Sequence, residues 1–145
     1  MPAKTRPRRK NTPVPLDFNH AMVYVRELAP ALHFYCDLLG FQLIEEYGGC
    51  YARLRTKGSQ TTLALHLAQP GESTAAEGTR LYFETKDLDR LCSSLEAAGV
   101  QFTQLPKLMP WGWKHAYLND PDGHEVSLYW AGRKRFQKTV MPKRP

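Results

Sequence analysis

Residues 80–100, RLYFETKDLDRLCSSLEAAGV, decide the fold because they contain a strand followed directly by a helix. We predict the strand over residues 80–85. Asp87 can cap the helix that follows, and Gly99 is placed to end it. Apolar side chains recur between them at helical spacing, at Leu88, Leu91, Leu95 and Ala98. The segment therefore predicts a strand and then a helix with one apolar face.

Three more strands follow this helix. They are predicted over residues 100–104, 114–119 and 125–130. Residues 120–123, Asp-Pro-Asp-Gly, are a strong turn signal between the last two strands. The second half of the chain therefore has the order βαβββ.

The first half of the chain has the same order. A strand over residues 18–26 precedes a helix with Pro30 in its first turn and Gly40 after its last. The apolar positions of this helix are Leu28, Leu32, Tyr35 and Leu39. Three strands complete the unit, over residues 41–46, 51–55 and 61–68, and residues 69–78 form a linker.

A βαβββ unit written twice, at an offset of about 60 residues, predicts an α+β fold. Two modules, expected over residues 17–69 and 79–131, form paired curved mixed sheets around a cleft, with the helices outside. Residues 16–132 are then the domain, a normal size for one compact unit in a chain of 145 residues.

The net charge of +6 is unevenly distributed along the chain. Five of the 20 Lys and Arg residues lie in residues 1–15 and six in residues 133–145, which leaves nine against all 14 acidic residues in the domain. The domain is therefore acidic, and we interpret the two ends as basic, disordered tails. Because the charge of the domain opposes binding to phosphates, nucleic acid is not expected as a partner.

The sequence also favours a cytoplasmic location. No apolar run approaches the length needed to cross a membrane, and residues 1–15 lack the apolar stretch of a secretion signal. The three cysteines, Cys36, Cys50 and Cys92, form no CxxC pair, as is usual in a reducing compartment.

Three stretches of the sequence resemble the vicinal oxygen chelate superfamily of glyoxalases, bleomycin resistance proteins and extradiol dioxygenases. They are NHAMVYV at residues 19–25, Phe34-Tyr35 with LLGF at residues 38–41, and NDPDGHEV at residues 119–126. The resemblance covers about residues 17–130 and implies the same repeated fold. It also implies a small-molecule ligand and a homodimer, in which the cleft is formed within one chain or across two.

The resemblance places possible metal ligands at the start of the first strand and in the middle of the last strand of each module. In this sequence the four positions are His20, His66, Arg80 and Ser127. Arginine cannot ligate a metal, and serine is a poor neutral ligand. Glu125 faces the same side as Ser127, so a shifted register or a bulge would complete a set with His20 and His66. Such a set suits Fe, Mn, Ni or Zn. Alternatively, Glu125 is an outer strand residue held by a nearby Lys or Arg.

Without a metal, the same four positions form a floor of hydrogen-bond donors with one fixed positive charge at Arg80. Tyr82 alternates with Arg80, and Tyr129 alternates with Ser127, so both tyrosines point to this floor or fill an ordinary core. Trp111 and Trp113 flank Gly112 in a loop, which suggests a pocket rim or lid.

Two functions follow as hypotheses, and the sequence favours the first. One is a metal-dependent lyase, isomerase or dioxygenase acting on a small molecule with neighbouring oxygens, assisted by Tyr82 or Arg80. The alternative is a metal-free protein of the bleomycin resistance type that binds a drug or an anionic metabolite. The charge of Arg80 opposes a cationic guest in that second case. Of the other histidines, His33 and His124 are expected at the surface, and His115 has no predicted place.

Overall fold

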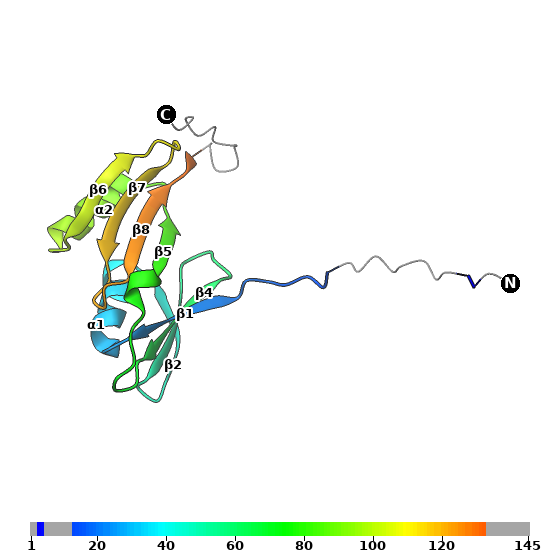
Figure 1. Ribbon diagram of the computed structural model, residues 1–145. Helices are drawn as coiled ribbons and strands as arrows, with labels where there is room; N and C mark the ends of the chain where they lie inside the picture. The colour runs from blue at the N-terminus through cyan, green and yellow to red at the C-terminus, as the bar shows by residue number, and fades with distance from the viewer. Residues whose placement is uncertain (1–2, 5–12, 133–145) are drawn as a thin grey trace.

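Two βαβββ modules follow each other in the chain, as the sequence predicts (Figure 1). The computed structural model describes residues 3–4 and 13–132. The first module contains β1 (His20–Val25), α1 (Leu28–Leu32), the π-helix η1 (His33–Leu38), β2 (Gln42–Tyr47), β3 (Tyr51–Arg55) and β4 (Thr62–Leu67). The second contains β5 (Arg80–Glu84), α2 (Leu88–Ala97), β6 (Phe102–Leu108), β7 (Lys114–Asn119) and β8 (Glu125–Trp130). A 3-10 turn, η2 (Ala76–Gly78), lies in the linker. Most of the predicted N-terminal tail and all of the C-terminal tail lie outside the described residues.

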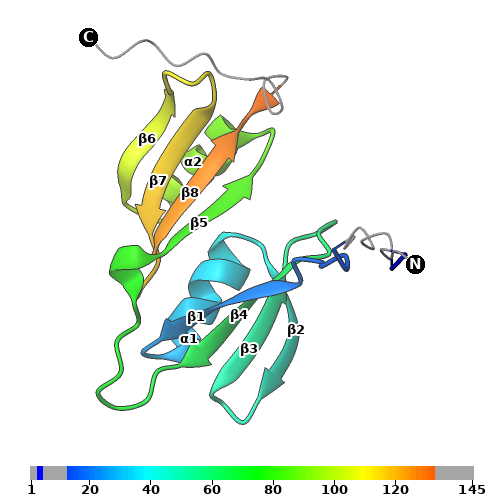
Figure 2. The same cartoon turned by 45° about the vertical axis from the view of Figure 1, so that its right-hand side comes forward.

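Each module forms one four-stranded mixed sheet with its helix on one side (Figure 2). The strand orders are β1-β4-β3-β2 and β5-β8-β7-β6. The first and last strands of a module pair in parallel, and the other pairs are antiparallel. The predicted α+β class is therefore confirmed. No helix in the described part of the chain is long and apolar enough to cross a membrane.

The helix of the first module changes from α to π geometry after Leu32. The wider turn buries Phe34 and Tyr35 side by side, together with Leu28 and Ala31. The predicted face of Leu28, Leu32, Tyr35 and Leu39 packs against the core, and the π-helical turn adds Phe34 to it. Gly40 then ends the helix with a φ of 78°, as expected of a glycine at this position.

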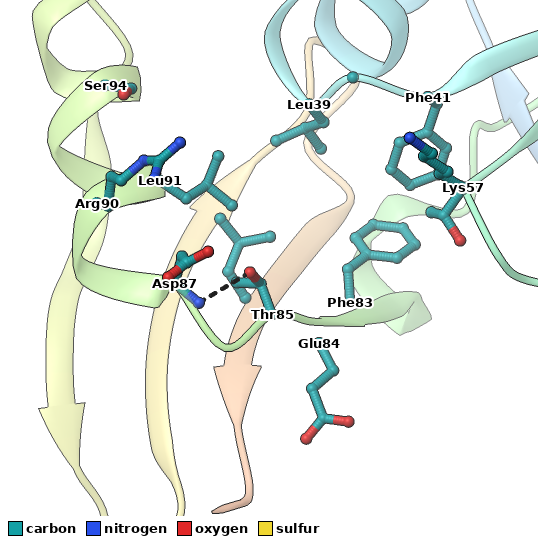
Figure 3. A pocket seen from close by; sticks show the side chains of 13 residues that line it. Leu39, Phe41, Lys57, Phe83, Glu84, Thr85, Asp87, Arg90, Leu91 and Ser94 are labelled. Carbon is teal, nitrogen blue, oxygen red and sulfur yellow. Dashed lines mark hydrogen bonds between the residues drawn. The ribbon is translucent and has the colours of Figure 1, made fainter.

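The helix of the second module packs through one apolar face, as predicted. Leu88, Cys92 and Leu95 are buried on it. The predicted side-chain cap at Asp87 is wrong, since its side chain forms no capping hydrogen bond. Instead, the backbone N–H of Asp87 donates to Thr85 Oγ1 at 3.2 Å (Figure 3).

The two modules contact each other through the end of the first helix and the segment that follows it. The ring of Phe83 on β5 meets Phe41 edge-on, with ring centroids 4.9 Å apart. The hydroxyl of Tyr35 donates to Asp120 Oδ2 in the β7–β8 turn at 2.7 Å. His124, which was expected at the surface, is fully buried beside Asp120. The surface prediction for His124 is wrong because Asp120, in the turn that precedes it, binds both His124 and Tyr35 of the first module.

Candidate functional site

The second sheet has one face against α2 and one face turned away from it. Because side chains alternate along a strand, burial of Val126 and Leu128 toward the helix places Ser127 and Tyr129 on the other face. Residues directly opposite in the register share a face, so Tyr82 lies beside Ser127. The residues that gather there, called the aromatic face below, are Tyr82, Trp111, Trp113, His115, Tyr117 and Tyr129.

Three rings of the aromatic face are nearly parallel. His115 and Tyr129 have centroids 5.3 Å apart at 15°, and Trp113 and Tyr129 have centroids 5.4 Å apart at 11°. Tyr82 meets His115 and Tyr129 edge-on, at 6.2 and 6.1 Å. Trp111 also meets His115 edge-on, at 5.5 Å. The structure thus brings together the four aromatic residues predicted from the sequence and adds His115.

His115 is the residue that the sequence reasoning missed. It is 3% exposed, and its signal was the position two residues after Trp113 and opposite Tyr129. Its Nδ1 lies 2.7 Å from Ser127 Oγ, and its Nε2 lies 3.3 Å from the indole nitrogen of Trp111. Burial lowers the pKa of His115 below its usual value, because the charged imidazolium is poorly solvated there.

These contacts fix the tautomer of His115. An indole nitrogen can only donate, so Nε2 of His115 must accept from Trp111. The single proton of the neutral ring then lies on Nδ1 and is donated to Ser127 Oγ. The ring at the centre of the aromatic face is therefore uncharged.

The charge of Arg80 is matched within the same sheet. Arg80 Nε donates to Glu125 Oε2 at 2.7 Å, and the two residues are directly opposite each other on β5 and β8. This contact favours the alternative reading of Glu125 as a strand residue held by an arginine. It also removes the main objection to a cationic ligand, since Arg80 no longer presents an unmatched charge.

Within one chain, the three residues predicted as metal ligands do not fit a single metal ion. His20 is opposite Thr62, whereas His66 is opposite Tyr24, four residues further along the same pair of strands. At about 3.3 Å per residue, this offset is roughly 13 Å, far more than two imidazoles bound to one ion allow. Glu125 lies in the other sheet, bound to Arg80. Among the described residues, no three His, Cys, Asp or Glu side chains gather to hold an ion.

His66 instead belongs to a small ring cluster of the first sheet. It meets Tyr24 and Tyr51 edge-on, with centroids 5.8 and 6.4 Å apart. Its Nδ1 lies 2.8 Å from the carbonyl oxygen of Leu67. His33 is exposed on η1, as expected, with Nδ1 2.9 Å from Asp37 Oδ2.

Two cavities flank β5. A groove of about 800 Å³ is lined by Tyr82, Tyr129 and Arg80 on one side and by residues 56–59 and 61–63 of the first module on the other. A smaller cavity of about 430 Å³ lies between the first helix and α2, with Phe41 and Phe83 in its wall (Figure 3). The larger groove is the one that reaches the aromatic face.

Residues 17–128 match the Glyoxalase/Bleomycin resistance protein/Dioxygenase superfamily, and the chain belongs to this family. This confirms the family resemblance seen in the sequence. No protein of curated function matches the sequence significantly.

Solved structures share the fold. TnmS3, an antibiotic binding protein from Streptomyces sp. CB03234, is 30% identical with a TM-score of 0.66, over 78% of this chain and 93% of that one. A superfamily member from Sphaerobacter thermophilus is 28% identical with a TM-score of 0.62, over 79% and 96%. Lactoylglutathione lyase from Agrobacterium tumefaciens is 21% identical with a TM-score of 0.65, over 79% and 93%, a likeness of fold alone.

Proposed function

We propose that the protein binds a planar aromatic small molecule, neutral or positively charged, on the aromatic face and without a metal ion. The observation that carries the proposal is the set of parallel rings formed by Trp113, His115 and Tyr129. Aromatic rings bind flat ligands by stacking and edge contacts, and they attract cations to their faces.

The charges around the aromatic face support this class of ligand. His115 accepts a hydrogen bond from Trp111 and is therefore neutral, and Arg80 is paired with Glu125. Tyr82 is 53% exposed at the side of the larger groove, so a ligand can reach the rings from there. The similarity to TnmS3 agrees with a binding protein.

The metal-dependent reaction favoured by the sequence has less support. Its first step needs an ion that polarises two neighbouring oxygens. The separation of His20 from His66 leaves no ligand set for that ion among the described residues.

We also propose a homodimer in the cytoplasm. Strands β1 and β5 are at sheet edges, and edge strands are sites where a second chain can pair or cover the sheet. The three cysteines are free thiols, which agrees with a reducing compartment. Sedimentation velocity would measure the oligomeric state.

The test uses thioflavin T, a planar aromatic cation, as the probe. We expect saturable binding by isothermal titration calorimetry with no chemical change in the dye, and a loss of affinity of at least tenfold in Tyr129→Ala. Tyr47→Ala is the matched control, because Tyr47 is 76% exposed on β2 of the other module.

Three results would overturn the proposal. The first is equal binding by Tyr129→Ala and Tyr47→Ala. The second is no binding of the dye or of neutral planar aromatics at all. The third is near-stoichiometric Fe, Mn, Ni or Zn in protein purified without a histidine tag that disappears in the His20→Ala/His66→Ala double variant. That result would restore the metalloenzyme.

A further inference from the structure

A chain of two hydrogen bonds joins the β6–β7 loop to the centre of the second sheet. The indole N–H of Trp111 donates to His115 Nε2, and His115 Nδ1–H donates to Ser127 Oγ. His115 and Ser127 are both buried, while Trp111 is half-buried on the loop. The chain therefore runs from the loop into the sheet.

The loop itself is a tight turn. Gly112 N–H donates to Met109 O at 2.9 Å, and Met109 N–H donates to Trp113 O at 2.8 Å. Gly112 has a φ of 91°, which a glycine adopts without strain. The backbone of the turn is thus closed by its own bonds, and a side-chain contact with His115 ties the Trp111 indole to the sheet.

The contact depends on the protonation state of the imidazole. With one proton, on Nδ1, the ring offers Nε2 as an acceptor to Trp111. With two protons, both nitrogens are donors, and the indole N–H faces another N–H. A second proton therefore removes this hydrogen bond and adds a positive charge to the aromatic face.

We propose that His115 is a positioning residue that holds Trp111 over the aromatic face while the imidazole is neutral and releases it on protonation. The consequence for ligands rests on the proposed function. A planar aromatic cation loses both the indole wall and the neutral surface when His115 is protonated, so its affinity falls as the pH falls.

The surroundings of His115 agree with a neutral ring. Tyr82 faces it from β5, Tyr129 from β8 and Tyr117 from its own strand. Lys107, directly opposite on β6, is the charged group of that strand on the same face. These groups are uncharged or cationic near neutral pH. The same face also carries Glu84, opposite Tyr129 on β5, and the Arg80–Glu125 pair. Burial is the cause that lowers the pKa of His115.

The first test is NMR of the full-length protein without ligand. Long-range ¹H–¹⁵N correlations report the tautomer of His115, and the indole resonance of Trp111 reports its hydrogen bond. We expect the Nδ1–H tautomer at pH 8 and a Trp111 resonance that shifts with the titration of His115, at a midpoint below 6.5. An Nε2–H tautomer would overturn the proposal, and so would a Trp111 resonance that does not shift as His115 titrates.

The second test is the pH profile of thioflavin T binding between pH 8 and pH 5. If the dye binds only the neutral form, its affinity falls about tenfold per pH unit below the midpoint. His115→Gln keeps an acceptor and a donor but does not titrate. We expect weaker dye binding at pH 8, because one ring of the aromatic face is lost, and an affinity that does not vary between pH 8 and pH 5. A purely structural histidine would leave the wild-type profile flat as well, and that result contradicts the proposal.

The two tests also separate this inference from the proposed function. Failure of thioflavin T to bind at any pH counts against the cationic ligand. The NMR titration decides the role of His115 independently. Trp111→Phe, which keeps a ring but has no indole N–H, should bind the dye with a pH profile shallower than that of the wild type.

Discussion

The hydroxyl of Tyr35 donates a 2.7 Å hydrogen bond to Asp120, 85 residues away in the other module. The same carboxylate accepts from His124 Nδ1 and from the backbone N–H groups of Asp122 and His124. His124 Nε2 also lies 3.0 Å from the carbonyl oxygen of Thr74 in the linker. The turn between β7 and β8 is therefore where helix, linker and second sheet are joined.

Replacing Tyr35 by Phe tests this junction. Burial raises the pKa of Tyr35 above its usual value, so its hydroxyl remains protonated and a donor near neutral pH. Tyr35→Phe removes a bond to a buried carboxylate and should lower the free energy of unfolding by about 1 to 3 kcal/mol. Urea denaturation at pH 7, followed by circular dichroism, measures the change.

Tyr47→Phe is the control for this variant, because Tyr47 is exposed on β2. It should change the free energy of unfolding by less than about 0.5 kcal/mol. Equal stabilities of the two variants would show that the Tyr35 hydroxyl does not contribute to the junction.

The pair of His124 and Asp120 predicts a pH dependence of stability. The hydrogen bond to Asp120 raises the pKa of His124 against the opposing effect of burial. A histidine with a raised pKa in the folded state stabilises the protein fully below its unfolded pKa of about 6.5. This contribution is lost as the pH rises through the folded pKa.

Asp120 acts at the other end of the pH range. Burial alone would raise the pKa of Asp120, yet the hydrogen bonds from His124 and Tyr35 outweigh it and lower the pKa. Its contribution is therefore present above the usual pKa of about 3.9 and is lost as the pH falls through the lower folded value.

Urea denaturation of His124→Gln and wild type between pH 5 and pH 9 separates these effects. The stability difference between the two proteins should be largest near pH 5 to 6 and shrink toward pH 9. His115 titrates in both proteins and therefore cancels in the difference. His33→Gln is the control, since His33 is exposed, and its difference should stay near zero. A His124→Gln difference that does not vary with pH would contradict a charged His124.

Strand positions follow from the sequence more reliably than strand pairing does. The strands at residues 51–55, 114–119 and 125–130 have the expected bounds, because alternation and the flanking turns are local signals. Pairing is set by neighbouring strands, and the parallel register of β1 and β4 separates His20 from His66 by four residues.

Burial of polar residues was the other limit of the sequence reasoning. His115 lies in a strand with mixed polarity, and its surroundings come from Tyr129 on β8 and Trp111 in the loop. His124 is buried because Tyr35, from the other module, covers the turn before it. The burial of His115 and His124 cannot be predicted from neighbouring residues in the sequence, since the side chains that cover them come from other segments of the chain.

Gly40 and Gly78 form a matched pair for a test of backbone conformation. A Cβ at either position would have nothing within 4 Å, but Gly40 has a φ of 78° and Gly78 has no positive φ in the left-handed range. Gly40→Ala should lower the free energy of unfolding by about 1 to 2 kcal/mol, the cost of left-handed backbone for a side chain. Gly78→Ala should leave it unchanged or slightly higher.

Thermal and urea denaturation of the two alanine variants measure this difference. Similar unfolding curves for both would mean that the helix can end at Gly40 without a left-handed residue. The backbone after the π-helical turn would then differ from the left-handed conformation that Gly40 has in the structure.

The pairing of Arg80 with Glu125 predicts how the aromatic face responds to charge. Glu125→Gln leaves the guanidinium of Arg80 unmatched beside the groove and should weaken thioflavin T binding. Because Arg80 is 69% exposed, water and salt screen this charge, and we expect a loss of only about two- to fivefold at low salt. The loss should shrink further in 0.5 M NaCl, since added salt shortens the range of the charge.

Two variants make this prediction specific. Arg80→Gln combined with Glu125→Gln removes both charges and should restore the wild-type affinity for the dye. Asp89→Asn breaks the exposed pair of Asp89 with Lys114, on the helix side of the same sheet, and should not change binding. If Glu125→Gln binds the dye as well as the wild type does, the matching of the Arg80 charge by Glu125 does not determine which ligands bind. Stronger binding of the anion 1-anilinonaphthalene-8-sulfonate than of thioflavin T by the wild type would point to an anionic ligand and against the proposed class.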